Sequence, residues 1–159
     1  MTVIVYLTVP DVLWINLQVT GASQPYRFDR LEEATFYQYG HGSSRDLIGQ
    51  AARLLTGFPR MRPFDRGNDA TAFVAFLVFL EANGRPLTLE DGEALDWVRR
   101  VWADGDSARS AIESVCAQEG EAHHGAEPDK QEIALGAIAR YRTTLGRLLA
   151  EEAPVPLGR

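Results

Sequence analysis

"DATAFVAFLVFLEAN", residues 69–83, is the stretch that decides the fold. Nearly every residue from 70 to 80 is apolar. A helix built from this stretch has no face suited to water, so it must run through the middle of a domain with other helices packed around it. Asn68 is a residue type that caps a helix start, and the pair Asn83-Gly84 is typical of a helix end. We therefore expect an all-α domain around a buried central helix.

Start and stop signals on both sides of this stretch predict further helices. Thr8 with Asp11 resembles a capping box, Pro10 suits a first turn, and Gly21 stops the helix of residues 9–20 that they open. The other predicted helices are 30–39, opened by Asp29; 45–55, capped by Ser43 or Ser44 and closed by Gly57 and Pro59; a tryptophan-bearing helix from Thr88 to about 103; 107–118; and 130–150. The acidic stretch 119–130 between the last two is expected to be a loop.

Two short segments are predicted as strands. Residues 3–8, "VIVYLT", are β-branched and apolar, and they are too few for a helix. Residues 85–89, "RPLTL", are expected to pair with them. The fold class is therefore all-α with a minor short β-strand pair, in a single domain that spans residues 1–159.

Composition excludes several classes of protein. The 159 residues with 45% hydrophobic content are enough for one core without a disulfide, and the lone Cys116 allows none within the chain. The net charge of -6 argues against nucleic acid as a partner. We find neither a signal peptide at the start nor the roughly 20 consecutive apolar residues of a membrane span. We expect a cytoplasmic protein of bacterial type that does not bind membranes.

The residues just before the central helix form a candidate anion site. The N-terminus of a helix offers free N–H groups and a partial positive charge, and Gly67 allows a bound group to approach the backbone. Arg60, Arg62 and Arg66 are close enough in sequence to add guanidinium groups, which bind phosphate or carboxylate. A second interpretation is open: the arginines pair with acidic residues such as Asp69.

"RPFDRGNDATA", residues 62–72, resembles the signature of the Fic/Doc (Fido) family, His-Pro-Phe-x-Asp-Gly-Asn-Lys-Arg-Thr-Ala in its Doc-like, death-on-curing branch. The matching residues, in register and without a gap, are Pro63, Phe64, Gly67, Asn68, Thr71 and Ala72. Flanking stretches are similar to Doc-like sequences as well, so the resemblance covers about residues 3–110. It implies a Fido-like helical domain with the motif loop at the start of its central helix, here with an extra C-terminal helix at about 130–150.

The departures from the signature fall at the chemical positions. Arg62 stands where the family has its catalytic histidine, and a guanidinium cannot act as a general base. Arg66 stands where the family has the acidic residue that holds Mg²⁺, and Asp69 and Ala70 replace the Lys-Arg pair. The resemblance therefore implies no catalytic residue and no cofactor in this chain.

Charge is redistributed within the loop rather than lost from it. The family's Asp, Lys and Arg sum to +1, and Arg62, Arg66 and Asp69 also sum to +1. The hypothesis that follows is an anion-binding loop made by Arg62, Arg66, Gly67, Asn68 and Asp69, with Arg66 in the cation position that Mg²⁺ holds in the family.

No other residue supplies the missing base. His41 lies in a turn-like stretch, and His123 and His124 lie in the acidic loop without a third ligand at metal spacing. "SVCAQEG", residues 114–120, resembles the family's self-inhibitory pattern but has one residue too many, and we interpret it as coincidence. Cys116 has no nearby basic partner in the sequence except Arg109.

These features predict a catalytically inactive pseudoenzyme that acts as a nucleotide- or phosphate-binding module or as a protein-interaction module, with a toxin-antitoxin relationship among the options. Candidate partners are a small antitoxin-like protein, a target protein, a phosphate-bearing ligand, and a second copy of the chain through the last helix. The alternative is a divergent active Fido transferase that uses ATP and Mg²⁺ to move AMP or phosphate to a protein hydroxyl. Loss of a general base alone typically costs about 10²- to 10⁴-fold in rate.

Overall fold

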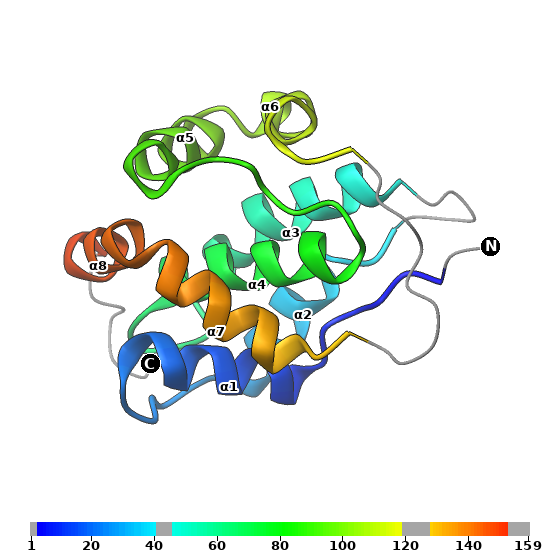
Figure 1. Cartoon of the computed structure of the whole chain (residues 1–159). Helices are drawn as coiled ribbons and strands as arrows, with labels where there is room; N and C mark the ends of the chain where they lie inside the picture. The colour runs from blue at the N-terminus through cyan, green and yellow to red at the C-terminus, as the bar shows by residue number, and fades with distance from the viewer. Residues whose placement is uncertain (1–2, 41–45, 119–127, 153–159) are drawn as a thin grey trace.

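The computed structural model describes residues 3–40, 46–118 and 128–152 (Figure 1). Within these ranges the chain forms α-helices, one short 3₁₀ turn at Gly105–Ser107 and no strand. The helices are α1 Val9–Thr20, α2 Phe28–Phe36, α3 Leu47–Met61, α4 Asn68–Ala82, α5 Asp91–Ala103, α6 Ala108–Val115, α7 Lys130–Arg140 and α8 Arg142–Glu151. The all-α prediction is confirmed.

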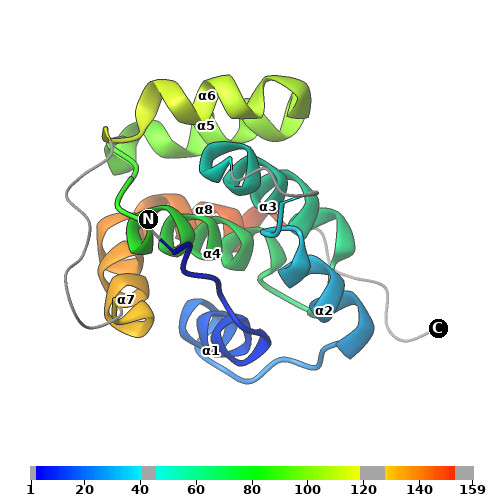
Figure 2. The same ribbon diagram turned by 90° about the vertical axis from the view of Figure 1, so that its right-hand side faces the viewer.

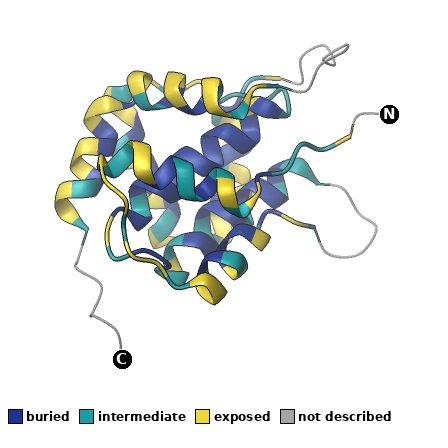
Figure 3. Cartoon of the chain, turned by 90° about the horizontal axis from the view of Figure 1, so that it is seen from below, coloured by how far each residue is buried: buried dark blue, intermediate teal, exposed yellow. Residues whose placement is uncertain are grey.

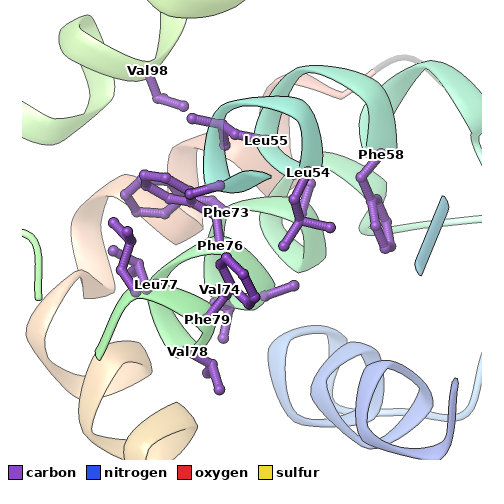
Figure 4. Close-up of a cluster of buried hydrophobic side chains, with 14 of the residues drawn as sticks. Leu54, Leu55, Phe58, Phe73, Val74, Phe76, Leu77, Val78, Phe79 and Val98 are labelled. Atoms are coloured by element: carbon purple, nitrogen blue, oxygen red, sulfur yellow. The ribbon is translucent and has the colours of Figure 1, made fainter. Parts of the chain in front are cut away.

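Helix α4 is the predicted central helix. It contacts α1, α3, α7 and α8, which surround it in two nearly perpendicular views (Figures 1 and 2). Its phenylalanines Phe73, Phe76 and Phe79 are fully buried, and they pack with Leu54 of α3 in the main hydrophobic cluster (Figure 4). Since an all-apolar helix has no solvent face, the sequence of α4 alone requires this burial.

The predicted start and stop of α1 are confirmed. The Thr8 hydroxyl accepts from the Asp11 N–H, and the Asp11 carboxylate accepts from the Thr8 N–H, which completes a capping box. Gly21 ends the helix in the left-handed conformation, with φ of 80°.

Helix α3 is longer than predicted because tertiary contacts support it beyond its stop signals. Its cap is Asp46, which accepts from the Gly49 N–H, whereas Ser43 and Ser44 lie outside the described residues. Gly57 and Pro59 both lie inside the helix. The ring of Tyr37 covers Gly57 so closely that an added Cβ would lie 2.7 Å from it.

Pro59 is accommodated in α3 by a donor from another helix. Proline has no N–H to donate to the carbonyl four residues earlier, which is that of Leu55. The indole Nε1 of Trp102 in α5 donates to this carbonyl at 2.9 Å. A side chain therefore supplies the hydrogen bond that the backbone of α3 lacks.

The predicted pair of strands is wrong. The first segment is extended, but its backbone pairs with side-chain amides: Val5 exchanges two hydrogen bonds with Asn83, and Leu7 exchanges two with Gln38. A side-chain amide has both donors and an acceptor, so it can pair with the N–H and the carbonyl of one residue, as a neighbouring strand does. Residues 85–89 pair elsewhere, through a bridge between Leu87 and Cys116.

The predicted last helix is two helices. The chain turns at Tyr141, whose buried hydroxyl donates to the Leu89 carbonyl at 2.6 Å. The Asp91 carboxylate caps the start of α8 by accepting from the N–H groups of Thr143 and Thr144, each at 2.9 Å. Long-range contacts therefore set this boundary, which no local signal marks.

The apolar stripe of α7 and α8 packs on the protein's own core. Ala137, Tyr141, Leu145 and Leu148 are buried, whereas the outward surface of the molecule is largely exposed or partly exposed residues (Figure 3). Leu135 of α7 is 50% exposed, and the prediction that the last helix joins two copies of the chain stays a prediction. No helix in the described ranges has the length and apolar character needed to cross a membrane.

Candidate anion-binding site

The loop between α3 and α4 follows a path held by hydrogen bonds on both sides. It leaves α3 at Arg62, which has a left-handed φ of 47°. The Asn68 side chain then donates to the Phe64 carbonyl and accepts from the Phe64 N–H, at 2.8 and 2.9 Å. Asn68 is fully buried, so its amide serves to fold the loop and is not available to a ligand.

Gly67 caps the start of α4, in place of the predicted Asn68. Its φ is 84°, a conformation that favours glycine. A Cβ at this position would lie 2.5 Å from Thr20 Cγ2 and 3.2 Å from Asn16 Nδ2. The space beside Gly67 is therefore filled by α1, which corrects the expectation that Gly67 is bare in order to admit a ligand.

Asn16 of α1 fixes the loop from the other side. Its Nδ2 donates to the Arg66 carbonyl at 3.0 Å and to the Thr71 hydroxyl at 3.1 Å, and it is 1% exposed. The backbone of the loop is consequently preorganised before any ligand is considered.

An anion already lies at the start of α4, and the chain itself supplies it. The residue that follows α8, Glu152, directs its carboxylate at the N-terminus of α4. Oε2 accepts from the Gly67 N–H at 2.7 Å, and Oε1 accepts from the Asp69 N–H at 2.8 Å. The Glu152 side chain is 4% exposed. Two backbone donors and a helix dipole thus hold a buried carboxylate, as expected for such a terminus.

Arg62 joins this carboxylate from the loop. Its Nη1 lies 3.4 Å from Glu152 Oε1 and 3.4 Å from Asp69 Oδ1. One guanidinium therefore stands between two carboxyl groups. The open alternative, that Arg62 pairs with Asp69, describes one of these contacts, and the membership of Arg62 and Asp69 in a site for an external anion stays a prediction.

Asp69 is the site residue with a strongly perturbed pKa. Burial raises the pKa of its carboxyl, the negative charge of Glu152 raises it further, and Arg62 opposes both, so that it reaches about 6. At neutral pH the three side chains carry two negative charges and one positive charge. Protonation of Asp69 would balance the cluster.

Arg66 does not join the site, although the sequence placed it there. It is exposed, and its Nη1 lies 3.5 Å from the Thr20 carbonyl on α1. Asn16 holds the Arg66 carbonyl, and the next residue, Gly67, has a left-handed φ of 84°. Arg66 thus lies away from the helix start in this structure, and the hypothesis that it replaces a metal ion there stays a prediction.

Arg60 also lies away from the site, with its guanidinium beside Gly105 in the turn after α5.

Cys116 is buried, and burial raises the pKa of its thiol, so that it is not an activated nucleophile. His41, His123 and His124 lie outside the described residues. Among the residues that the structure does describe, no group of three or more His, Cys, Asp or Glu could hold a metal ion.

Sequence reasoning missed the residue that fills the site. Glu152 lies more than eighty residues from its partners, at |i−j| of 83 and 85. One weak signal was present: two acidic residues, Glu151 and Glu152, end a helix whose C-terminal dipole disfavours negative charge. Glu151 is compensated by ion pairs with Arg99 and Arg147, and Glu152 by the start of α4.

Comparison of the chain with protein-family models, with curated proteins and with solved structures found no match.

Proposed function

We propose that this chain is a Fic/Doc-like helical module without transferase activity, and that its loop at the start of α4 is a binding site for an anionic group. The observation that carries the proposal is the contact with Glu152. Its two carboxylate oxygens bond to separate N–H groups, and Arg62 approaches one of them. A ligand with two oxygens on one carbon or phosphorus atom matches this set of donors.

The resemblance to the family supplies the reason for inactivity. The position of the catalytic histidine is held by Arg62, whose charge is paired with Asp69 and Glu152. A guanidinium group is a hydrogen-bond donor without an acceptor, so it cannot take a proton from a hydroxyl group. At the position of the family's metal ligand, Arg66 offers a positive charge, which does not bind Mg²⁺.

An external ligand has to displace the Glu152 carboxylate. Phosphate groups of a nucleotide and acidic side chains of a partner protein, an antitoxin-like segment among them, share the required chemistry. Because Glu152 is attached to the chain, its effective concentration at the site is high, of the order of millimolar for a short linker. Binding is therefore expected to be weak in the wild-type protein and stronger when Glu152 is removed.

Thermal unfolding with added ligands tests the proposal. The ligands are ATP, ADP, CDP-choline, UTP, inorganic phosphate and a glutamate-rich peptide, each with and without Mg²⁺. We expect Glu152→Ala to gain a shift of a few degrees that does not depend on Mg²⁺, because a ligand at about 100 times its dissociation constant stabilises by about 2.7 kcal/mol. The unfolding midpoints of the wild type and of the neighbouring control, Glu151→Ala, should rise less when the same ligands are added.

Each outcome of this experiment has a distinct meaning. A shift with nucleotides but not with the peptide identifies a phosphate-binding module, and the reverse identifies a protein-interaction module. A variant Glu152→Ala that folds and responds to none of the ligands would refute the anion site. A shift that requires Mg²⁺ would favour the second candidate function.

That second candidate is an active transferase, and one observation favours it. The carboxyl of Asp69 has a pKa of about 6, which is close to the value that suits a general base at neutral pH. Incubation with radiolabelled ATP, Mg²⁺ and candidate protein acceptors tests it. Label on a protein hydroxyl that Asp69→Asn abolishes would establish the activity and overturn the pseudoenzyme proposal.

A further inference from the structure

A cavity lies at the other end of α4, away from the loop. It has a volume of about 350 Å³, which falls in the range of small-molecule sites. Three elements form it: the last turns of α4, residues 86–87, and the inner face of α7, which lies beside α4 (Figures 1 and 2). Its floor is apolar and buried, and it comprises Leu77, Leu87, Ala137 and Tyr141.

The wall of this cavity is braced by Arg140. Its guanidinium donates to the carbonyls of Leu87 and Leu89 at 3.1 and 3.0 Å and lies over the Tyr141 ring, 5.0 Å from its centroid. These contacts hold the segment after α4 against α7. Arg140 therefore has a structural role that accounts for its presence at the cavity.

Two carboxylates at the rim of the cavity, unlike Arg140, make no contact that holds the described parts of the structure together. Glu81 and Glu132 line the cavity and are exposed, and within the described residues neither carboxylate makes a hydrogen bond or an ion pair. Glu81 also lies in the last turn of α4, where the helix dipole disfavours negative charge. The rim and the helix end together present net negative charge above an apolar floor.

One position in the lining of the cavity is a glycine with open space beside it. Gly136 lies inside α7 and lines the cavity, and a Cβ added there would meet no atom within 4 Å. Glycine is less stable than alanine in a helix interior, so the missing side chain weakens α7 and leaves the space beside it free.

We propose that this cavity binds a small organic cation, an ammonium or guanidinium group attached to an apolar body. The apolar body would lie on the floor, and the cation would lie between Glu81 and Glu132. Charge complementarity selects this class: Glu81 and Glu132 carry two negative charges and Arg140 one positive charge, so the charged groups that line the cavity sum to -1 and favour a cation over an anion.

Amide NMR titration with three probes of equal shape tests the proposal: phenylbutylamine, phenylbutanol and phenylbutyrate. We expect the amine to shift signals from residues around the cavity and to bind about tenfold more tightly than the alcohol, since each exposed carboxylate contributes modestly. The double variant Glu81→Gln with Glu132→Gln should remove this preference while the alcohol binds as before.

A pair of glycine substitutions gives a matched control. Gly136→Leu fills the cavity and should abolish binding, whereas Gly146→Leu, at an equally open glycine of α8 outside the cavity, should leave it unchanged. The proposal is overturned if the alcohol or the butyrate binds as tightly as the amine, if none of the probes binds, or if folded Gly136→Leu still binds. Should Gly136→Leu not fold, the double glutamine variant decides.

Discussion

Glu152 connects the end of the chain to the start of the central helix. Its carboxylate satisfies two N–H groups of α4 that no local side chain reaches, because Gly67 has none and the Asn68 amide is used by Phe64. A residue outside the motif thus supplies the hydrogen-bond acceptor for the backbone N–H groups of the motif loop. The loop binds an anion in the absence of any added ligand.

Removal of this carboxylate should measurably destabilise the fold. We expect Glu152→Ala to lower the free energy of unfolding by about 2 kcal/mol, since it removes a helix cap and charge-assisted hydrogen bonds to backbone N–H groups. Glu151→Ala, whose exposed ion pairs contribute little, should change it by less than about 1 kcal/mol. Urea denaturation at neutral pH measures both, and equal effects would contradict the capping role.

Asp69 should make stability depend on pH in the opposite direction to a carboxylate whose pKa is lowered by an ion pair in the folded protein. Its pKa rises from 3.8 to about 6 in the folded protein. Between these values the folded state keeps a proton that the unfolded chain has released, so the free energy of unfolding falls as pH rises from 4 to 6. The loss becomes complete only once the pH is above the folded-state pKa of about 6.

The amide variant isolates this effect. Asp69→Asn cannot ionise, so we expect it to be more stable than the wild type by about 1 to 2 kcal/mol at pH 8, after allowance for partial exposure, and nearly equal to it at pH 4. Urea denaturation across this range gives the difference. Asp65→Asn, in the same loop, is the matched control. A difference that is the same at both pH values would show that Asp69 acts by packing alone.

On the scale of the element, helix α3 depends on a hydrogen-bond donor from another helix. Trp102 of α5 donates to the Leu55 carbonyl that Pro59 leaves without a donor. We expect Trp102→Phe to cost about 1 to 3 kcal/mol, because it leaves a buried carbonyl unpaired and also removes part of a ring that packs on α3. In a Pro59→Ala background the alanine N–H can reach the same carbonyl.

Trp102→Phe should therefore lower the free energy of unfolding by less in the Pro59→Ala background than in the wild type. A double-mutant cycle by urea denaturation measures the coupling, which we expect to be about 1 kcal/mol. Additive effects of the two substitutions would mean that the indole N–H does not replace the missing backbone donor.

On the scale of the whole molecule, α4 makes the described helices one cooperative unit. It contacts α1, α3, α7 and α8, while α5 and α6 are joined to this group through α8 and α3. We expect a single unfolding transition, in which far-ultraviolet circular dichroism and tryptophan fluorescence coincide. The fluorescence comes from Trp14 in α1 and from Trp97 and Trp102 in α5, so it reports on opposite sides of α4. Separate midpoints for the two signals would show that the α5–α6 pair unfolds independently.

The candidate site was predictable in part. Arg62, Gly67, Asn68 and Asp69 do gather at the start of α4, because sequence neighbours at a helix start are neighbours in space. Their roles were less predictable. The side chain of Arg66 turns away toward α1, and the Asn68 amide folds the loop where a helix cap was expected.

The sequence by itself determined the central helix, the first helix with its capping box, and the all-α class. These depend on the composition of a contiguous apolar run and on residues three or four positions apart, which the chain carries locally. Tertiary structure alone decided the passage of α3 through Pro59, the pairing of the first segment with the amides of Asn83 and Gln38, and the carboxylate on α4. Each of these satisfies a backbone group with a side chain from a distant part of the sequence, and such a partner is chosen only when packing brings the two together.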